Sequence, residues 1–112
     1  MDDSSAGAAI VVLTNLPDRE SAGRLARALV EGRLAACVSI GATVESIYHW
    51  RGKTETAVEV PVSVKTRAAL FLQVEAAIRS FHPYELPEIV AVPLTHGSTA
   101  YLDWIAAATH AA

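Results

Sequence analysis

The stretch AVEVPVSVK, residues 57–65, decides the fold of this 112-residue chain. Its valines occupy every second position, which is the period of a β-strand with one apolar face. Pro61 stands inside this pattern and has no N–H group to donate to a β ladder. We therefore expect a long strand in which the nitrogen of Pro61 faces a bulge, a sheet edge or another subunit.

A turn at residues 51–53 connects this strand to an equally long one before it. The preceding strand runs from Leu34 to Trp50 and is rich in apolar and β-branched residues. Gly41 lies in its middle, where we expect a bulge. The two strands together predict an unusually long antiparallel hairpin.

One-to-one pairing in this hairpin fixes a register. With the tip near Gly52, the numbers of paired residues sum to roughly 104, so Ser39 lies opposite Lys65. Cys37 is then one diagonal from Lys65, whose ammonium group favours a thiolate that a soft metal ion can use as a ligand. The alternative for Cys37 is a small, buried apolar side chain.

The segments before the hairpin predict a strand and a helix. Residues 9–13 form a short apolar run that is typical of a buried strand. Asp18 is a natural N-cap, and apolar residues at helical spacing follow it as far as Gly32.

The segments after the hairpin repeat this arrangement. Thr66 is expected to cap a second helix whose apolar face spans residues 70–81, and the His-Pro pair at residues 82–83 ends this helix. Residues 89–92 form a fourth strand, and Ser98 opens a last helix.

The order βαββαβ with an additional C-terminal helix predicts an α+β, ferredoxin-like antiparallel sheet. We expect residues 9–109 to form a single domain after a tail at residues 1–8. Both crossover helices would cover one face of the sheet and leave the other face apolar. Because 52% of the residues are hydrophobic, we expect other subunits to cover that face.

Composition and charge exclude several classes of protein. The formal net charge is -3 without a basic stripe, so nucleic acid is not an expected partner. No apolar run approaches the roughly 20 residues of a membrane-spanning helix. The first residues are acidic and polar, unlike a secretory signal, and a single cysteine suits a reducing cytoplasm.

A second group of reactive side chains follows the second helix. His82, Tyr84 and Glu85 offer an imidazole, a phenol and a carboxylate, which suit a metal ion or the hydroxyl groups of an anionic ligand. The alternative is a rigid turn in which His82 caps the end of the helix. A Cys37 nucleophile with His82 as its base is opposed by topology, because the two lie about 20 Å apart at opposite ends of the sheet.

Four further residues of the hairpin allow two interpretations each. Tyr48 and Trp50, near the tip, are placed either to stack on a ligand or to pack against another strand or subunit. Glu59 and Lys65 share one strand face, but six residues separate them, so each is solvated or paired across an interface.

Five stretches, taken together and in order, resemble the CutA divalent-ion tolerance family. They are residues 13–18, 33–38, 48–53, 64–66 and 82–89. The resemblance extends from about Ile10 to Trp104. The chain departs from the family at Pro61 and Ser63, where apolar residues are usual, and at residues 41–43, which lack the usual proline.

The resemblance implies a fold similar to that of the PII signalling proteins, assembly into a homotrimer through strand pairing, and a link to tolerance of copper and other divalent ions. It also implies a site between subunits. Cys37 and His82 match positions of candidate metal ligands. The matching positions for a bound small molecule are Trp50, Glu59, Lys65, Tyr84 and Glu85.

Our leading hypothesis is a non-catalytic trimer that requires no cofactor and binds copper, another divalent metal ion or a small anionic ligand between subunits. One alternative is a PII-like signalling module in which Lys65 holds an anionic metabolite. Two others are a scaffold that anchors other proteins and a hydrolase that uses Cys37.

Overall fold

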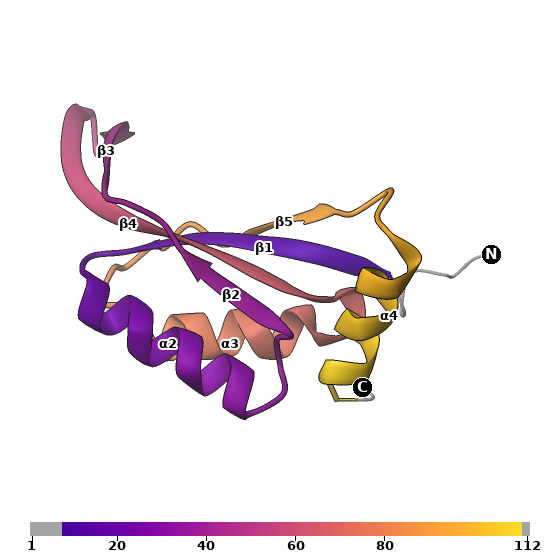
Figure 1. Ribbon diagram of the computed structural model, residues 1–112. Helices are drawn as coiled ribbons and strands as arrows, with labels where there is room; N and C mark the ends of the chain where they lie inside the picture. Colours follow the sequence, from indigo (N-terminus) through magenta and orange to yellow (C-terminus); the bar gives the residue numbers. More distant parts are fainter. Residues whose placement is uncertain (1–7, 111–112) are drawn as a thin grey trace.

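The computed structural model describes residues 8–110, which form one antiparallel sheet with two long helices on one face (Figure 1). Its elements are β1 (Ala9–Leu16), α2 (Arg19–Glu31), β2 (Cys37–Ile40), β3 (Val44–Trp50), β4 (Lys53–Arg67), the 3-10 turn η1 (Ala68–Leu70), α3 (Phe71–Phe81), β5 (Val90–Pro93) and α4 (Thr99–Ala108). The predicted tail lies outside the described residues except for Ala8, whose carbonyl oxygen accepts a hydrogen bond from the N–H of Ala68 at 2.8 Å.

The strand order is β2-β4-β1-β5, and β3 pairs with the first half of β4, residues 53–59. The central strand β1 therefore lies between β4 and β5, as the ferredoxin-like order requires, and every strand pair is antiparallel. The predicted α+β architecture is confirmed. None of the helices in residues 8–110 combines the length and the apolar character needed to cross a membrane.

The predicted hairpin register is wrong by two residues. Cys37, and not Ser39, lies opposite Lys65. At the tip, Trp50 pairs with Lys53, so the turn contains only Arg51 and Gly52, both with positive φ angles of 51° and 81°. This two-residue loop accounts for half of the error, because positive φ at both positions is the geometry of a tight type I′ turn.

The bulge accounts for the other half of the error. Ile40 pairs with Val62 and Val44 pairs with Glu59, so three residues between β2 and β3 face only two residues of β4. One extra residue on one strand is the definition of a bulge, and its predicted position at Gly41 is confirmed.

The bulge also explains how β4 contains Pro61. The N–H of Gly41 donates to the carbonyl oxygen of Pro61 at 2.9 Å. Because the N and C=O of one strand residue point to the same side, the nitrogen of Pro61 faces the bulge, where no donor is required. A side chain at Gly41 would place its Cβ 3.0 Å from Cγ of Pro61, so the close approach favours glycine.

The first helix begins and ends where the sequence predicts. Asp18 is the N-cap of α2, and its carboxylate accepts the N–H of Ser21 at 2.7 Å. Gly32 is the C-cap. Ser98 likewise caps α4 by accepting the N–H of Tyr101.

The predicted cap of the second helix is wrong. Thr66 belongs to β4, which stays paired with β1 as far as Arg67, and its buried hydroxyl donates to the carbonyl oxygen of Leu34 at 2.6 Å. The chain enters α3 through η1, and Leu70 occupies the N-cap position without a side-chain hydrogen bond. Strand pairing has thus outweighed the local capping preference of a threonine.

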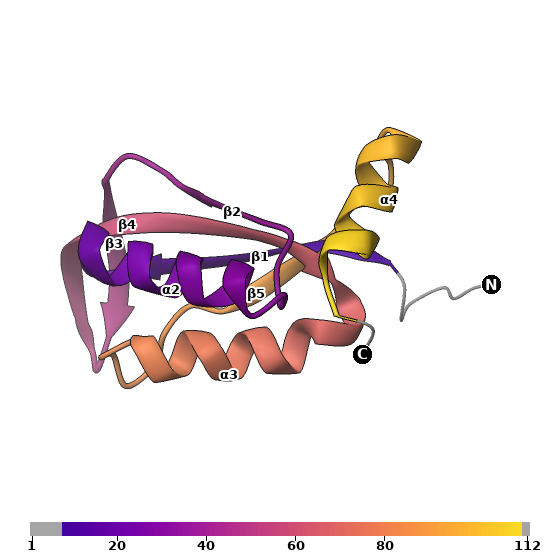
Figure 2. The same ribbon diagram turned by 60° about the horizontal axis from the view of Figure 1, so that its bottom comes forward.

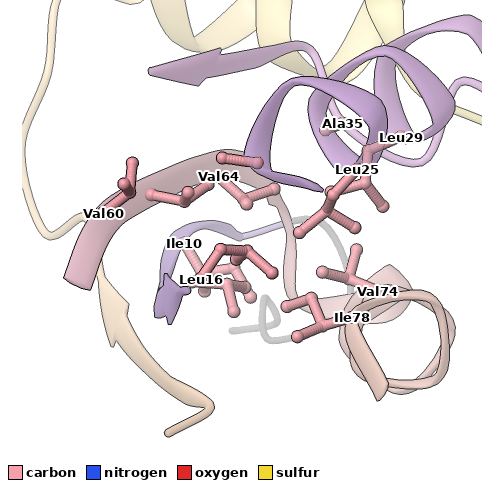
Figure 3. Close-up of a cluster of buried hydrophobic side chains, with 12 residues drawn as sticks. Ile10, Leu16, Leu25, Leu29, Ala35, Val60, Val64, Val74 and Ile78 are labelled. Carbon is pink, nitrogen blue, oxygen red and sulfur yellow. The ribbon is translucent and has the colours of Figure 1, made fainter. Parts of the chain in front are cut away.

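The core lies between the sheet and the two long helices (Figure 3). Side chains from alternate positions of β1 and β4 meet Leu25 and Leu29 of α2 and Val74 and Ile78 of α3. Burial of each such side chain contributes about 1.5–3 kcal/mol. The valine alternation that predicts the strand therefore also defines its buried face.

The opposite face of the sheet, which we call the open face, is apolar on β1 and β5 but not on β4. The valines of β4 face the helices, so this strand presents Pro61, Ser63 and Lys65 on the open face. The prediction that the valines of β4 make this face apolar is therefore wrong. Val11 pairs with Val92, and Leu13 pairs with Val90, so these four side chains share this face. Val90 and Val92 are 48% and 47% exposed. The two long helices lie on the other side of the sheet (Figure 1).

Candidate functional site

A cleft of about 650 Å³ lies between the β3–β4 hairpin and the α3–β5 loop, residues 82–89. Figure 2 shows the hairpin tip beside this loop. We call this cleft the acidic cleft. Its lining residues are Asn15, Ser46, Ile47, Tyr48, His49, Trp50, Arg51, Glu59, Tyr84, Glu85, Leu86 and Glu88.

Strand register explains why the hairpin side of the cleft is both aromatic and acidic. Tyr48 and Trp50 are two residues apart on β3 and so point to the same face. Val44, a further four residues back on that face, pairs with Glu59 of β4. Glu59 therefore shares the face with both aromatic rings.

Glu59 is the most deeply buried acidic group of the cleft, with only 9% of its surface exposed. Its carboxylate makes no hydrogen bond or ion pair within residues 8–110. The oxygen atoms of this carboxylate remain accessible from the cleft, so its negative charge is open to a ligand there. This side chain is the strongest indication of a ligand in the cleft.

Two polar contacts hold the α3–β5 loop in place. At the hairpin tip, the Arg51 guanidinium contacts Glu85 Oε1 at 2.6 Å and lies 5.1 Å from the centre of the Trp50 ring. At the other end of the cleft, Nδ2 of Asn15 donates to Oε1 of Glu88 at 3.0 Å. The loop is thus tied to both the hairpin and the end of β1.

His82 anchors the start of the same loop. Its Nδ1 accepts the N–H of Tyr84 at 3.2 Å, so the ring proton lies on Nε2, which donates to the backbone oxygen of Asn15. Both ring nitrogens are occupied and the residue is buried. In this subunit His82 fixes the loop to the end of β1.

Tyr84 packs on His82, with 4.4 Å between the ring centres, and its side chain lines the cleft. Burial raises the pKa of Tyr84 above its ordinary value, and the negative charge of Glu59 adds to this effect. The phenol is therefore a neutral hydroxyl near Glu59 at physiological pH.

The cleft brings together four of the five predicted ligand-binding residues: Trp50, Glu59, Tyr84 and Glu85. Lys65 is not among the lining residues. It lies six residues from Glu59 along β4, which corresponds to about 20 Å.

The two predicted metal ligands lie apart in one chain. Cys37 is partly buried opposite Lys65, which in turn pairs with Val11, whereas His82 contacts Asn15 at the other end of β1. The separation is about 13 Å along the strand and about 10 Å across two strand spacings. Within residues 8–110, no three His, Cys, Asp or Glu side chains converge as a metal site would require.

Tyr48, which the sequence offers together with Trp50 as a stacking residue, also lines the cleft. Several other cleft residues were not predicted from the sequence. Arg51 carries no signal in the sequence, since its direction depends on the left-handed backbone of the turn. Asn15 and Glu88 are 73 residues apart, and only the folded chain brings them together.

The charge of the cleft favours a cation. Its lining contains three carboxylates, from Glu59, Glu85 and Glu88, against the single guanidinium of Arg51. A cavity lined mainly by one sign of charge attracts ligands of the opposite sign.

Comparison with known proteins identifies the family. The model of the CutA1 divalent ion tolerance protein family matches residues 10–108. The divalent-cation tolerance protein CutA of Thermus thermophilus is 44% identical over 95 residues, which cover 85% of this chain and 92% of that protein. The crystal structure of CutA1 from Shewanella sp. SIB1 superposes with a TM-score of 0.90 at 39% identity, covering 93% of this chain and 97% of that one.

A plant relative is longer than this chain and is named as a chloroplastic protein. The chloroplastic protein CutA of Arabidopsis thaliana is 40% identical over 96 residues, and the match covers 86% of this chain but only 53% of the relative. This chain therefore spans about half the length of that protein.

The relatives from Thermus thermophilus and Escherichia coli are named as divalent-cation tolerance proteins and not as enzymes, in agreement with the expected non-catalytic role. The family match, the sequence identities and the superposition agree with one another. The chain belongs to the CutA1 divalent ion tolerance family.

Proposed function

We propose that this protein is a non-catalytic trimer that contributes to tolerance of divalent cations by binding them in the acidic cleft, which a neighbouring subunit completes. The observation that carries the proposal is the buried, unpaired carboxylate of Glu59 in a cleft with an excess of negative charge. A divalent cation that enters the cleft would neutralise that charge and take the carboxylate as an oxygen ligand.

The open face supports the proposed trimer. Val11, Leu13, Val90 and Val92 form an apolar surface on a sheet whose other face is already covered by helices. Burial of such a surface against a second copy is favourable by about 25 cal/mol per Å². The exposed edge of β5 offers unpaired backbone groups to the same contact.

A neighbouring subunit is needed because one chain supplies too few ligands. Glu59, Glu85 and Glu88 offer oxygen ligands but do not converge on one point. Cys37, partly buried on the open face, stays a candidate soft ligand for copper at the subunit contact. His82 is a weaker candidate, since it would first have to release Asn15 and Tyr84.

The alternative functions have less support from the geometry. An anionic metabolite would meet three carboxylates in the cleft, while Lys65 lies about 20 Å away along β4. A hydrolase would need Cys37 beside His82, which one chain does not provide. We retain the cytoplasm as the proposed compartment, on the basis of the single cysteine.

Isothermal titration of the purified protein with Cu²⁺, together with light scattering for its mass, tests the proposal. We expect a trimer and saturable binding that Glu59→Gln weakens by about tenfold or more. Glu45→Gln is the matched control. It removes the same charge, but Glu45 lies on the opposite face of the hairpin and outside the cleft. A monomer, or equal affinity in both variants, would contradict the proposal.

A further inference from the structure

The acidic cleft has a size that a bare metal ion does not require. Its volume of about 650 Å³ lies within the roughly 300–1,000 Å³ of typical small-molecule pockets. A divalent ion bound by carboxylates occupies only a small part of such a space. The part of this volume that a neighbouring subunit leaves open is filled by water or by the body of a larger ligand.

The lining of the cleft indicates what that body is. Tyr48 and Tyr84 contribute aromatic side chains to the cleft beside Glu59, since the charges of Glu59 and Tyr48 both act on the phenol of Tyr84, whereas Trp50 lies nearer the hairpin tip. Divalent cations prefer oxygen ligands and make little use of aromatic rings. Aromatic faces next to a carboxylate instead suit a guanidinium or ammonium group on an apolar stem, which gains from both cation–π contact and charge pairing.

The protein's own Arg51 demonstrates this mode of binding at the mouth of the cleft. Its guanidinium carbon lies 5.1 Å from the centre of the Trp50 ring, and Nη2 contacts Oε1 of Glu85 at 2.6 Å. One planar cation is thus held by an aromatic ring and a carboxylate. Glu59, which is far more buried than Glu85, has no equivalent partner within residues 8–110.

We propose that the cleft binds a small organic cation, a guanidinium or alkylammonium compound, with its charged group at Glu59 and its apolar stem against Tyr48 and Tyr84. This inference rests on the proposed function only in taking the acidic cleft as the ligand site. The organic cation competes with a divalent cation for the same carboxylate.

Tyr84 adds a polar contact to this arrangement. Its hydroxyl stays protonated at physiological pH, because burial and the charge of Glu59 raise the pKa of the phenol. A neutral hydroxyl accepts a hydrogen bond from a guanidinium N–H. Such a directional contact favours a cation with several N–H donors over a quaternary ammonium.

The test compares butylguanidinium with butylurea, which has nearly the same shape but no charge. For this test the protein is prepared with the substitution Trp104→Phe. Trp50 is then the only tryptophan of the sequence, and its fluorescence reports on the cleft. We expect saturable binding of butylguanidinium, at least about tenfold tighter than that of butylurea. Because this comparison uses one protein, it does not depend on the folding of a cleft variant.

Variants then assign the charged contact. Glu59→Gln is expected to remove about tenfold or more of the affinity for butylguanidinium, and Glu45→Gln is expected to leave it unchanged. Absence of saturable binding, equal affinity for butylurea, or equal affinity in both variants would overturn the inference. A separate Cu²⁺ titration of the protein with Glu59 intact distinguishes the two proposals, because absence of copper binding there, with butylguanidinium still bound, refutes only the metal-binding function.

Discussion

The guanidinium of Arg51 and the carboxylate of Glu85 meet at 2.6 Å, and this contact joins the tip of the β3–β4 hairpin to the α3–β5 loop. Both side chains are largely exposed, at 68% and 70%. An exposed ion pair contributes little to global stability but restricts the segments that it connects. The contact therefore restricts motion at the mouth of the cleft and contributes little to the stability of the fold.

Arg51→Ala is expected to lower the free energy of unfolding by less than about 1 kcal/mol. Hydrogen exchange of residues 82–89 should nevertheless become faster, because the loop loses its contact with the hairpin tip. Arg79→Ala is a suitable control, since it removes an exposed ion pair with Glu75 that lies within α3. Unchanged exchange in the loop of the Arg51 variant would show that the contact does not hold the mouth of the cleft.

His82→Ala is expected to destabilise the protein by about 2 kcal/mol, because it leaves the Asn15 carbonyl and the Tyr84 N–H without their partner in a buried region. Urea unfolding measures this change. The same substitution at His96, an exposed residue, should shift the unfolding free energy by less than about 0.5 kcal/mol. Equal effects at the two positions would refute the anchoring role of His82.

Asp18 should make the stability of the protein depend on pH in the acidic range. The hydrogen bond from the Ser21 N–H lowers the pKa of Asp18 below its ordinary value of 3.8. Its stabilising effect is therefore complete above the unfolded-state value and is lost as the pH falls through the lower folded-state pKa. Asp18→Asn keeps a capping oxygen, so it should remove this pH dependence while retaining the helix, as urea unfolding between pH 2 and 6 would show. An unchanged pH profile in the Asn variant would contradict this assignment.

Val92→Lys should dissociate the proposed trimer, because it puts a charge into the open face. Light scattering should then give the mass of a smaller species. Leu72→Lys, on the exposed side of α3, is the matched control and should leave the mass unchanged. A trimer that persists in the Val92 variant would place the subunit contact elsewhere.

The strand order and most element boundaries follow from local patterns in the sequence. The valine alternation of β4 gives its two faces, and Asp18 and Ser98 cap their helices through contacts within three residues. Such features are local, so a sequence contains them completely. Thr66 has the same local preference, but pairing with a distant strand overrides it.

Half of the register error and the missed role of Arg51 have a common cause. The backbone at Arg51 has positive φ, which moves the tip of the hairpin by one residue and also directs the guanidinium toward Glu85. No pattern of residue types predicts that direction. The contact of Asn15 with Glu88 likewise exists only because the α3–β5 loop returns to the end of β1.

The central claim is that the acidic cleft binds a cation at Glu59, and a crystal structure of the protein soaked with Cu²⁺ tests it most directly. Anomalous scattering locates copper independently of any assumption about its ligands. We predict a peak in the cleft, in contact with a carboxylate oxygen of Glu59 and with a group from a neighbouring subunit. Copper found only at Cys37 on the open face, with the cleft free of it, would contradict the claim.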